Sequence, residues 1–240
     1  MSLQKGDFIL IDYTAKVKET GEPFDTTNEA VSKSAHLHKE GETYEPKLMV
    51  IGEGWMLKPI DEAFTTMEAG KPATIEIPPE KAFGPRDPEK IKRVSLKQLY
   101  EKGIERPSIG ARIEYSGKMA TIRSMGAGRV LLDFNAPLAG RTLVYEITIQ
   151  KKLESTEDKM ISLIHRRIPG ADQTKFKLTT EPNILTIEMP EETYYLEGIQ
   201  VAKRGIAMDI QKYFAEITTV KFIETHKTEP TKQEATVNKA

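Results

Sequence analysis

Two strand-like stretches that lie far apart in the chain constrain its fold most. Residues 7–18 and 142–150 place apolar side chains at every second position, which is the period of a half-buried strand. The inward positions are Ile9, Ile11, Tyr13, Ala15 and Val17 in the first stretch and Leu143, Tyr145, Ile147 and Ile149 in the second. Because residues 85–137 differ in character, we predict one sheet that is interrupted by an inserted module and then resumes.

The remaining elements of the first domain can be placed by their turns and periods. A strand is predicted at 46–51 and another after the turn at Gly70. Between them we predict a short helix at 59–66, since proline is favoured at a first helical position and Pro59 begins this segment. Residues 26–43 are polar and have no clear period, so they are predicted to form a flexible flap.

The insertion is predicted to be a small β-rich module. Ser95 and Gln98 form a capping box that opens a short helix, and Gly103 ends it. Three strands follow, at 111–115, 118–123 and 129–134. A module of this kind can be accommodated at an exposed loop of the first domain.

The last third of the chain is predicted to fold in the order helix, strand, strand, helix, strand. Its elements are a helix capped by Ser155, strands at 174–180 and 184–189, a helix at 192–214 and a last strand with Val220 and Phe222. The fold class is therefore α+β, with an antiparallel half-barrel around a short helix, an inserted domain and a C-terminal α-β-β-α-β domain. The predicted domains are 1–84 with 138–152, 85–137 and 153–225, followed by a polar, disordered tail at 226–240.

Composition excludes several classes of function. With 35 Lys and Arg against 36 Asp and Glu, the chain has no excess of positive charge for a nucleic-acid surface. It contains no cysteine, which rules out disulfides and thiolate zinc sites and fits a reducing compartment. No apolar run approaches the ~20 residues of a membrane helix, and the polar start is no signal peptide. We expect a cytoplasmic protein that binds neither membranes nor nucleic acid.

Three short motifs bring aromatic side chains toward what we predict to be one shallow pocket. They are Tyr13 with Pro23-Phe24-Asp25, then Pro79-Glu80-Lys81-Ala82-Phe83-Gly84, then Leu138 to Tyr145. Asp25 is the single carboxylate beside the rings, which is a poor set for hydrolysis or redox chemistry. Such a set of side chains is well suited to binding a proline ring.

These motifs resemble the FKBP-type peptidyl-prolyl cis-trans isomerases. The insertion resembles that of the SlyD-type members, which add chaperone activity, and the predicted function resembles that of the long-chain archaeal members. The resemblance covers about residues 3–152. It implies an isomerase with folding-chaperone activity, whose partners are unfolded or proline-containing polypeptides.

The resemblance also implies the roles of individual residues. Tyr13, Phe24, Phe83 and Tyr145 fall on the aromatic positions of the pocket, Ile60 on its floor, and Asp25 beside it. Met56 and Leu57 fall on the segment whose backbone N–H binds the substrate carbonyl. Two positions depart from the family: Phe83 replaces a usual tyrosine, and Ala136 stands where relatives often have histidine. Both departures favour the alternative of a non-enzymatic holdase chaperone or proline-binding adaptor.

Isomerisation of a peptide bond before proline needs no cofactor. Its barrier of ~18–20 kcal/mol comes from lost amide resonance, and a protein lowers it by binding the twisted amide better than the planar one. We therefore expect no cofactor and no catalytic metal. His36 and His38 could pair on a metal, although a solvated flap is the favoured interpretation.

The insertion carries many apolar side chains for its size. They are Leu99, Tyr100, Met119, Ile122, Met125 and Leu131. Most are expected to form a thin core, but so small a module is not expected to bury them all. Methionine is common on surfaces that bind diverse partners, so we predict a client-binding groove here.

The C-terminal domain is predicted to form a homodimer, with a monomer as the alternative. A three-stranded sheet has two unpaired edges, and it can cover only part of the helix stripe formed by Ile199, Ile206 and Ile210. Tyr194, Tyr195 and Leu196 add the large side chains that are enriched at interfaces.

Overall fold

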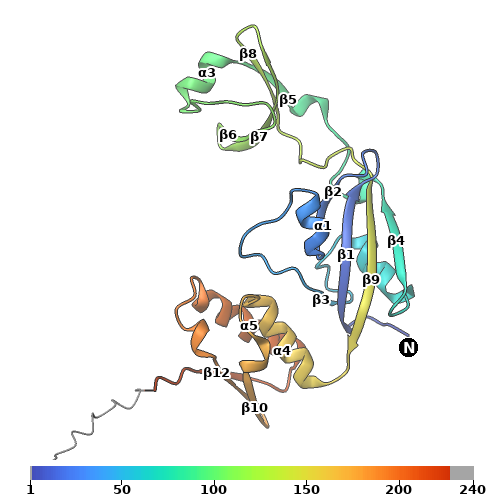
Figure 1. Ribbon diagram of the computed structural model, residues 1–240, viewed down its shortest axis with the longest axis vertical. Coiled ribbons are helices and arrows are strands. Elements are labelled where there is room, and N and C mark those ends of the chain that lie inside the picture. Colours follow the sequence, from blue (N-terminus) through green and yellow to red (C-terminus); the bar gives the residue numbers. More distant parts are fainter. Residues whose placement is uncertain (1, 228–240) are drawn as a thin grey trace, which may run out of the picture. The chain divides into compact units, whose positions relative to one another are not determined.

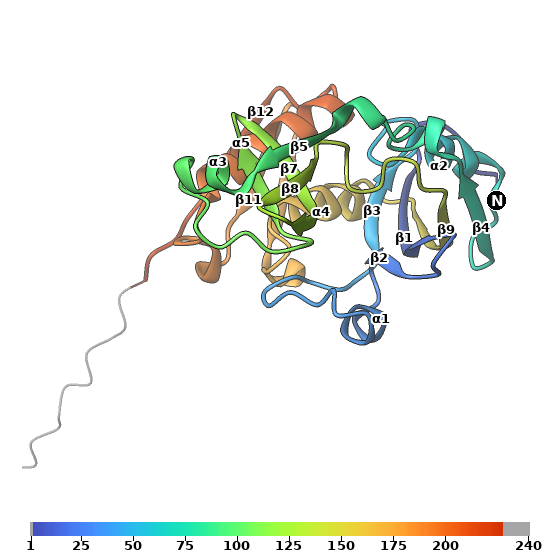
Figure 2. The ribbon, with the colours of Figure 1, turned by 90° about the horizontal axis from the view of Figure 1, so that it is seen from above.

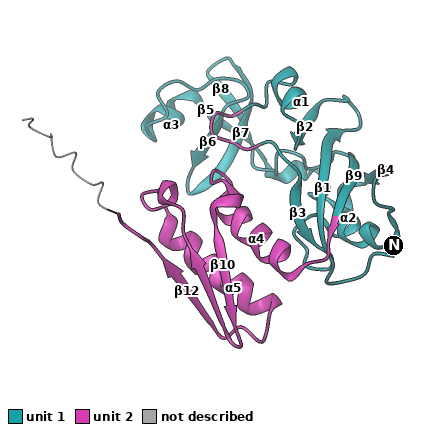
Figure 3. Cartoon of the chain, turned by 60° about the horizontal axis from the view of Figure 1, so that its bottom comes forward, with its two compact units in different colours: residues 1–38, 44–151 teal, residues 39–43, 152–240 magenta. Residues whose placement is uncertain are grey.

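The computed structural model describes residues 2–227 and divides the chain into two compact units (Figure 3). The first unit comprises residues 1–38 and 44–151, and the second comprises residues 39–43 and 152–240. The first unit contains two separate sheets and the second contains one.

The main sheet of the first unit is antiparallel and has the order β2-β1-β9-β4, with β3 also paired to β1 (Figure 1). Its strands are β1 (Phe8–Val17), β2 (Pro23–Thr26), β3 (Lys47–Val50), β4 (Pro72–Ile77) and β9 (Leu143–Leu153). The predicted alternation of the two long strands is confirmed, because their inward side chains form one buried core. The sheet is thus built from segments on both sides of the insertion.

A short helix lies against this sheet (Figure 2). Helix α2 (Lys58–Ala63) continues into a 3-10 turn, Phe64–Thr66, so the helix predicted at 59–66 tightens at its end. Ile60 and Phe64 are fully buried in the core of the sheet. This arrangement confirms the predicted α+β half-barrel around a short helix.

The flap contains a helix that the sequence pattern did not predict. Helix α1 (Glu29–Ser34) begins at Asn28, whose side chain accepts a hydrogen bond from the Val31 N–H. The helix is six residues long and buries only Ser32, so it has no apolar stripe for a periodicity argument to detect. The capping residue Asn28 was the available signal.

The insertion forms its own four-stranded antiparallel sheet, in the order β5-β8-β7-β6. Its elements are β5 (Ile91–Ser95), α3 (Leu96–Glu101), β6 (Arg112–Tyr115), β7 (Lys118–Gly126) and β8 (Arg129–Asp133). The sequence pattern does not predict strand β5, because Lys92 and Arg93 interrupt any apolar alternation in this stretch. Charged side chains are common on edge strands, which is where β5 lies. The capping box at the start of α3 is present as predicted, with both reciprocal hydrogen bonds.

The second unit has the element order predicted for it. Its elements are α4 (Thr156–Arg167), β10 (Lys177–Glu181), β11 (Ile184–Glu188), α5 (Ile199–Tyr213) and β12 (Thr219–Ile223). Strands β11 and β12 pair in parallel, so the chain must cross over between them, and α5 makes that connection. The helix predicted at 192–214 begins only at Ile199, because Gly198 has a φ of +76° that a helix cannot contain.

The apolar stripe of α5 is covered within its own unit. Ile199, Ile206 and Ile210 are buried, and α5 packs on α4 and β12. The expectation that this stripe needs an outside cover is therefore wrong. Other apolar side chains of the unit are exposed instead, namely Tyr195, Leu196, Val201, Met208 and Ile223.

Two further expectations concern the membrane and the tail. Among the described residues, no helix has both the length and the apolar character needed to span a bilayer. Most of the predicted disordered tail, from residue 228 onward, lies outside the described residues.

Candidate active site

Strand pairing brings three polar side chains to one face of the main sheet. Strands β2 and β3 both pair with β1, so that Ala15 lies opposite Asp25 and Ile11 lies opposite Lys47. Residues that are directly opposite in a sheet point to the same face, and so do alternate residues of one strand. Tyr13 lies midway between Ile11 and Ala15, so its side chain shares a face with those of Asp25 and Lys47.

These three side chains are in contact. The Tyr13 hydroxyl donates a hydrogen bond to Oδ2 of Asp25 at 2.7 Å. Nζ of Lys47 lies 3.5 Å from the Tyr13 hydroxyl oxygen and 5.7 Å from the centre of its ring. Because an ammonium group can only donate, the Tyr13 hydroxyl accepts from Lys47 and donates to Asp25. The carboxylate is thereby fixed beside the aromatic rings.

Sequence reasoning missed Lys47. The signal was available, because Lys47 alternates with Met49 and Ile51, which belong to the buried core beside α2. A lysine in step with core residues points its charge toward the inner face of the sheet.

Three of the predicted aromatic residues form one cluster. The rings of Tyr13 and Tyr145 have centroids 6.1 Å apart, and Phe24 meets Tyr145 edge-on at 6.0 Å. Tyr13 and Tyr145 are almost fully buried, and Phe24 packs against the same core. Edge-on and tilted contacts are favoured geometries for aromatic pairs. The cluster forms an apolar wall next to Asp25.

Tyr145 remains a neutral phenol throughout the physiological range. Burial, together with the negative charge of Asp25, raises its pKa to about 12. A neutral phenol can donate a hydrogen bond, whereas a phenolate cannot.

The floor of the site is formed by α2 and the segment that precedes it. Ile60 is fully buried in the core, and Met56 and Leu57 pack against that core. The Asp61 carboxylate accepts hydrogen bonds from the N–H groups of Gly52 and Gly54. These bonds hold the turn that leads from β3 to α2, so they fix the position of the segment with Met56 and Leu57.

Phe83 differs from the other predicted pocket residues. Its side chain is 45 % exposed, and the neighbouring Ala82 packs against the core in its place. The turn is closed by a 2.7 Å hydrogen bond from the Gly84 N–H to the Pro79 carbonyl. Phe83 is therefore held at the surface.

The structure corrects the predicted client-binding set of the insertion. Leu99 and Ile122 have no exposed surface and form the core of the module, so neither can touch a client. Met125 packs against that core, and Leu131 is half-buried. Tyr100 and Met119 are about half exposed, at 51 % and 49 %. Ile109, which sequence reasoning missed, is 66 % exposed, and its position between Pro107 and Gly110 was the signal for a loop.

Neither flap histidine lies in a group of metal ligands within the described residues. In that part of the chain, no three His, Cys, Asp or Glu side chains come together in a way that could hold an ion. The ring of His38 stacks on that of Tyr44, with centroids 5.3 Å apart.

A separate hollow of about 480 Å³ lies beside β1, α1 and β9. Its lining includes Asp12, Thr14, Glu146 and Thr148, which alternate with the inward residues of β1 and β9, and it also includes Tyr13. The four alternating side chains point away from the aromatic cluster. The hollow is polar and is not the proline site predicted from the sequence.

The site thus consists of an antiparallel sheet around a short helix, with an aromatic wall beside the carboxylate of Asp25. A family model described as FKBP-type peptidyl-prolyl cis-trans isomerase matches residues 1–150. A second, described as FKBP26_C-terminal, matches residues 156–227. Because the first model covers more than half of the chain, the chain belongs to the FKBP-type peptidyl-prolyl cis-trans isomerase family.

Individual relatives agree with this assignment. The chain is 34 % identical over 148 residues to the short-type peptidyl-prolyl cis-trans isomerase of Methanocaldococcus jannaschii, covering 62 % of this chain and 92 % of the relative. It is 24 % identical over 153 residues to the FKBP-type 16 kDa peptidyl-prolyl cis-trans isomerase of Escherichia coli, with the same coverage. It is 26 % identical over 125 residues to the FKBP-type peptidyl-prolyl cis-trans isomerase SlyD of Helicobacter pylori, covering 50 % of this chain and 66 % of the relative.

Proposed function

We propose that this protein isomerises peptide bonds before proline in unfolded protein clients, and that the insertion holds those clients as a chaperone. The observation that carries the proposal is the hydrogen bond from Tyr13 to Asp25 within the wall formed by Tyr145 and Phe24. The proline ring packs against this wall. The amide before it then leaves water and lies beside a fixed carboxylate.

Catalysis at this site needs no covalent step. A planar amide is stabilised by resonance and by water on its polar atoms, and the twisted amide loses the resonance. An apolar wall removes the water, and fixed dipoles interact differently with the planar and twisted forms. Each 1.36 kcal/mol of preference for the twisted form gives about a tenfold higher rate. We assign Asp25 to the electrostatic role and Met56 and Leu57 to the backbone contact with the substrate.

Client holding is assigned to the exposed apolar side chains of the insertion. Tyr100, Ile109 and Met119 remain exposed although the module has a core of its own. A second weak contact keeps an unfolded chain near the pocket and raises its effective concentration there. SlyD, named among the relatives, supports this assignment by its similarity to the chain.

Replacing residues 87–134 by a short loop tests whether the insertion holds clients while the main domain carries out catalysis. The rate constant kcat/KM for a short proline peptide should be retained, because the aromatic cluster, Asp25 and α2 all lie outside the replaced segment. Catalysis of the proline-limited refolding of a protein should fall at least tenfold. Equal losses on both substrates would show that the insertion shapes the pocket and does not hold clients.

Point variants provide a milder test. Replacing Tyr100 and Met119 by serine removes exposed apolar surface and leaves the buried core of the module intact. Replacing the exposed Lys118 by serine is the control, since it adjoins Met119 and removes a charged side chain instead of an apolar one. Only the first variant should bind an unfolded client more weakly.

A non-enzymatic holdase or adaptor is the alternative function. Phe83 offers no hydroxyl group, and its exposure leaves that side of the pocket open. The two functions differ in turnover, since a holdase acts only in amounts comparable to its client. The cytoplasmic location, a homodimer through residues 153–225, and the lack of membrane and nucleic-acid partners stay predictions.

A further inference from the structure

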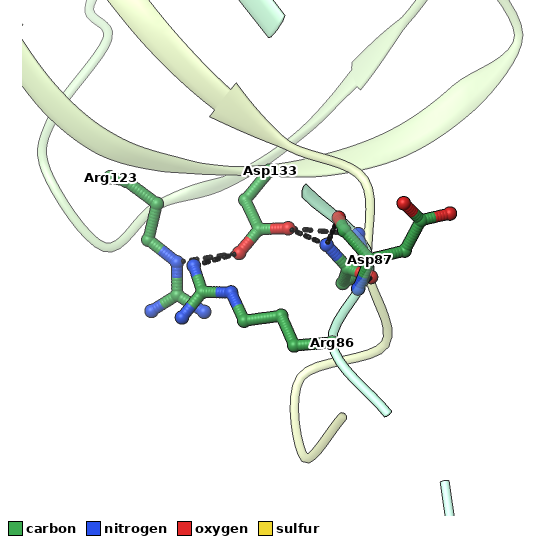
Figure 4. Close-up of polar contacts among 5 residues, drawn as sticks. Arg86, Asp87, Arg123 and Asp133 are labelled. Carbon is green, nitrogen blue, oxygen red and sulfur yellow. Dashed lines mark hydrogen bonds and ion pairs between the residues drawn. The ribbon is translucent and has the colours of Figure 1, made fainter. Parts of the chain in front are cut away.

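The chain enters and leaves the insertion through two short connections that are bound to each other. The incoming connection is residues 84–87, and the outgoing connection is residues 134–140, which follow the end of β8 at Asp133. Next to the main sheet, the N–H of Gly140 donates to the carbonyl of Gly84 at 2.9 Å. Next to the insertion, a group of side chains joins the same two segments (Figure 4). We call this group the junction cluster; it consists of Arg86, Asp87, Arg123, Asp133 and Asn135.

A buried carboxylate is the centre of the junction cluster. Asp133 is 1 % exposed, and its Oδ2 accepts from Nη2 of Arg86 at 2.6 Å and from Nε of Arg123 at 2.9 Å. Its Oδ1 accepts from the backbone N–H and from Nδ2 of Asn135, at 2.9 and 2.8 Å. A buried charge persists when it is paired and hydrogen-bonded in this way. Burial alone would raise the pKa of Asp133, but the bonds from Asn135 and Arg123 and the charge of Arg86 lower it below its usual value.

Asn135 binds the incoming connection as a neighbouring strand would. Its Oδ1 accepts from the N–H of Asp87 at 2.9 Å, and its Nδ2 donates to the carbonyl of Asp87 at 2.9 Å. One side-chain amide therefore satisfies both backbone groups of a residue on the other connection. The two connections are joined at this level as well as at Gly84 and Gly140.

Arg86 also contacts the outgoing connection through its backbone. A Cβ atom built on Gly140 would lie 2.9 Å from the Cβ and 3.3 Å from the N atom of Arg86. Gly140 has a φ of +74°, so both the space and the conformation favour glycine there. Arg86 thus lies close to the outgoing connection at Gly140, while its guanidinium binds Asp133 at the end of β8.

We propose that the junction cluster makes the two connections act as one hinge, with Arg86 as the positioning residue that ties the incoming connection to Asp133. Two independent tethers would spread a client held by the insertion over a larger volume, which lowers its effective concentration at the pocket. One hinge confines that volume. This inference rests on the proposed client-holding function for its consequence, although the hinge itself is a property of the chain.

Arg86 and Arg123 provide a matched pair of variants. Both donate to the same oxygen of Asp133, and both side chains are 41 % exposed. Arg123 comes from β7 inside the insertion, whereas Arg86 comes from the incoming connection. Arg86→Met and Arg123→Met therefore each remove one ion pair with Asp133. Only Arg86→Met removes the ion pair that binds the incoming connection to Asp133.

The test is a distance distribution measured by pulsed electron paramagnetic resonance on the full chain. Because the chain has no cysteine, spin labels can be placed at Glu68→Cys and Lys118→Cys, two exposed positions in the main domain and the insertion. Arg86→Met should broaden the distribution about twofold, and Arg123→Met should leave its width unchanged. Equal broadening in both variants, or none in Arg86→Met, would overturn the proposal.

A second pair of variants tests the same proposal if Arg86→Met does not fold. Gly140→Ala should also broaden the distribution, because the new methyl group displaces Arg86. Gly128→Ala is its control, since Gly128 has a similar φ of +71° but open space around it. Broadening by Gly128→Ala to the same extent, or an unchanged width in Gly140→Ala, would contradict the role of Arg86.

Measuring isomerase activity on a short peptide and on an unfolded protein distinguishes a failure of the hinge proposal from a failure of the proposed client-holding function. Arg86→Met should keep kcat/KM on a short proline peptide and lose about threefold to tenfold on an unfolded protein, while Arg123→Met keeps both. If the insertion-replaced protein loses nothing on unfolded protein, client holding fails, and the distance distributions still decide the hinge. Suppose that the insertion-replaced protein does lose activity on unfolded protein. If Arg86→Met then broadens the distance distribution but keeps full activity on unfolded protein, the positioning role of Arg86 is contradicted.

Discussion

At the residue scale, the sequence predicts that Tyr13 and Asp25 lie near each other, but it does not predict the hydrogen bond between them. The motifs placed Tyr13, Phe24, Asp25 and Tyr145 near one pocket, and the structure brings these four together. The bond depends on the register of β2 against β1, which shifts at a bulge between Ala15 and Lys16. Alternation within single strands carries no information about such a register.

The Tyr13 hydroxyl is expected to matter through Asp25 rather than through packing. Tyr13→Phe keeps the ring and removes the donor to Asp25. A hydrogen bond to a charged group contributes about 1.5–3 kcal/mol, so kcat/KM on a short proline peptide should fall by about tenfold to a hundredfold. Asp25→Ala and Tyr13→Ala should lower kcat/KM further while the fold persists.

Phe83→Tyr should leave the isomerase activity unchanged or raise it. Full activity in both Asp25→Ala and Tyr13→Ala would show that the site is misplaced.

Tyr145 should be visible in an alkaline titration. Its folded-state pKa of about 12 lies above the value of about 10 for an unfolded tyrosine, so its contribution to stability is complete below pH 10 and is lost as the pH rises toward 12. Tyrosinate absorbance should show a late step that is absent from Tyr145→Phe. The same titration curve in both proteins would contradict the burial of Tyr145 beside Asp25.

At the element scale, long periodic segments and capping signals were predictable, and short elements were not. The strands β1 and β9 and the capping box of α3 follow from the residues themselves. Helix α1 and strand β5 are short and largely exposed, so neither has a periodic apolar face. The sequence did not predict that Leu99 and Ile122 are buried while Tyr100 and Met119 are exposed. The composition of the insertion does not say which way each side chain points.

The start of α5 depends on the left-handed conformation of Gly198. Gly198→Ala has no steric neighbour within 4 Å, so its cost is backbone strain alone, about 1 kcal/mol. Gly170→Ala, in the same unit, also has open space but no such φ, and it should be nearly neutral. Hydrogen exchange of the buried Ile206 and Ile210 amides measures both. Equal effects of the two substitutions would contradict the assigned start of the helix.

At the scale of the whole molecule, the homodimer hypothesis keeps Tyr195 as support and replaces the stripe of α5 by other exposed apolar residues of that helix. The stripe of α5 is buried, but Tyr195 is 86 %, Val201 77 % and Met208 60 % exposed in the same unit. Val201 and Met208 are seven residues apart on α5 and so lie on one side of it. A second copy of the unit would cover this apolar surface, and the resulting particle would carry two proline pockets and bind long clients with higher avidity.

Light scattering decides the oligomeric state. The full chain is expected to be a dimer at micromolar concentration, and Val201→Glu with Met208→Glu should give a monomer because two charges would be buried at the interface. Gln200→Glu, an exposed neighbour on the same helix, is the charge control and should remain dimeric. A truncation after Lys152 should also be monomeric. A monomeric full chain, or a truncation that still dimerises, would contradict the hypothesis.

The most direct test of the account is the refolding of a protein whose slow phase is limited by proline isomerisation, with this protein present at about one hundredth of the client concentration. The slow phase should accelerate in proportion to the amount added, and Asp25→Ala should abolish most of the acceleration. If the wild-type protein leaves the slow phase unchanged at catalytic amounts and only suppresses aggregation at amounts equal to the client, the protein is a holdase and the proposed catalytic role of the aromatic site is wrong.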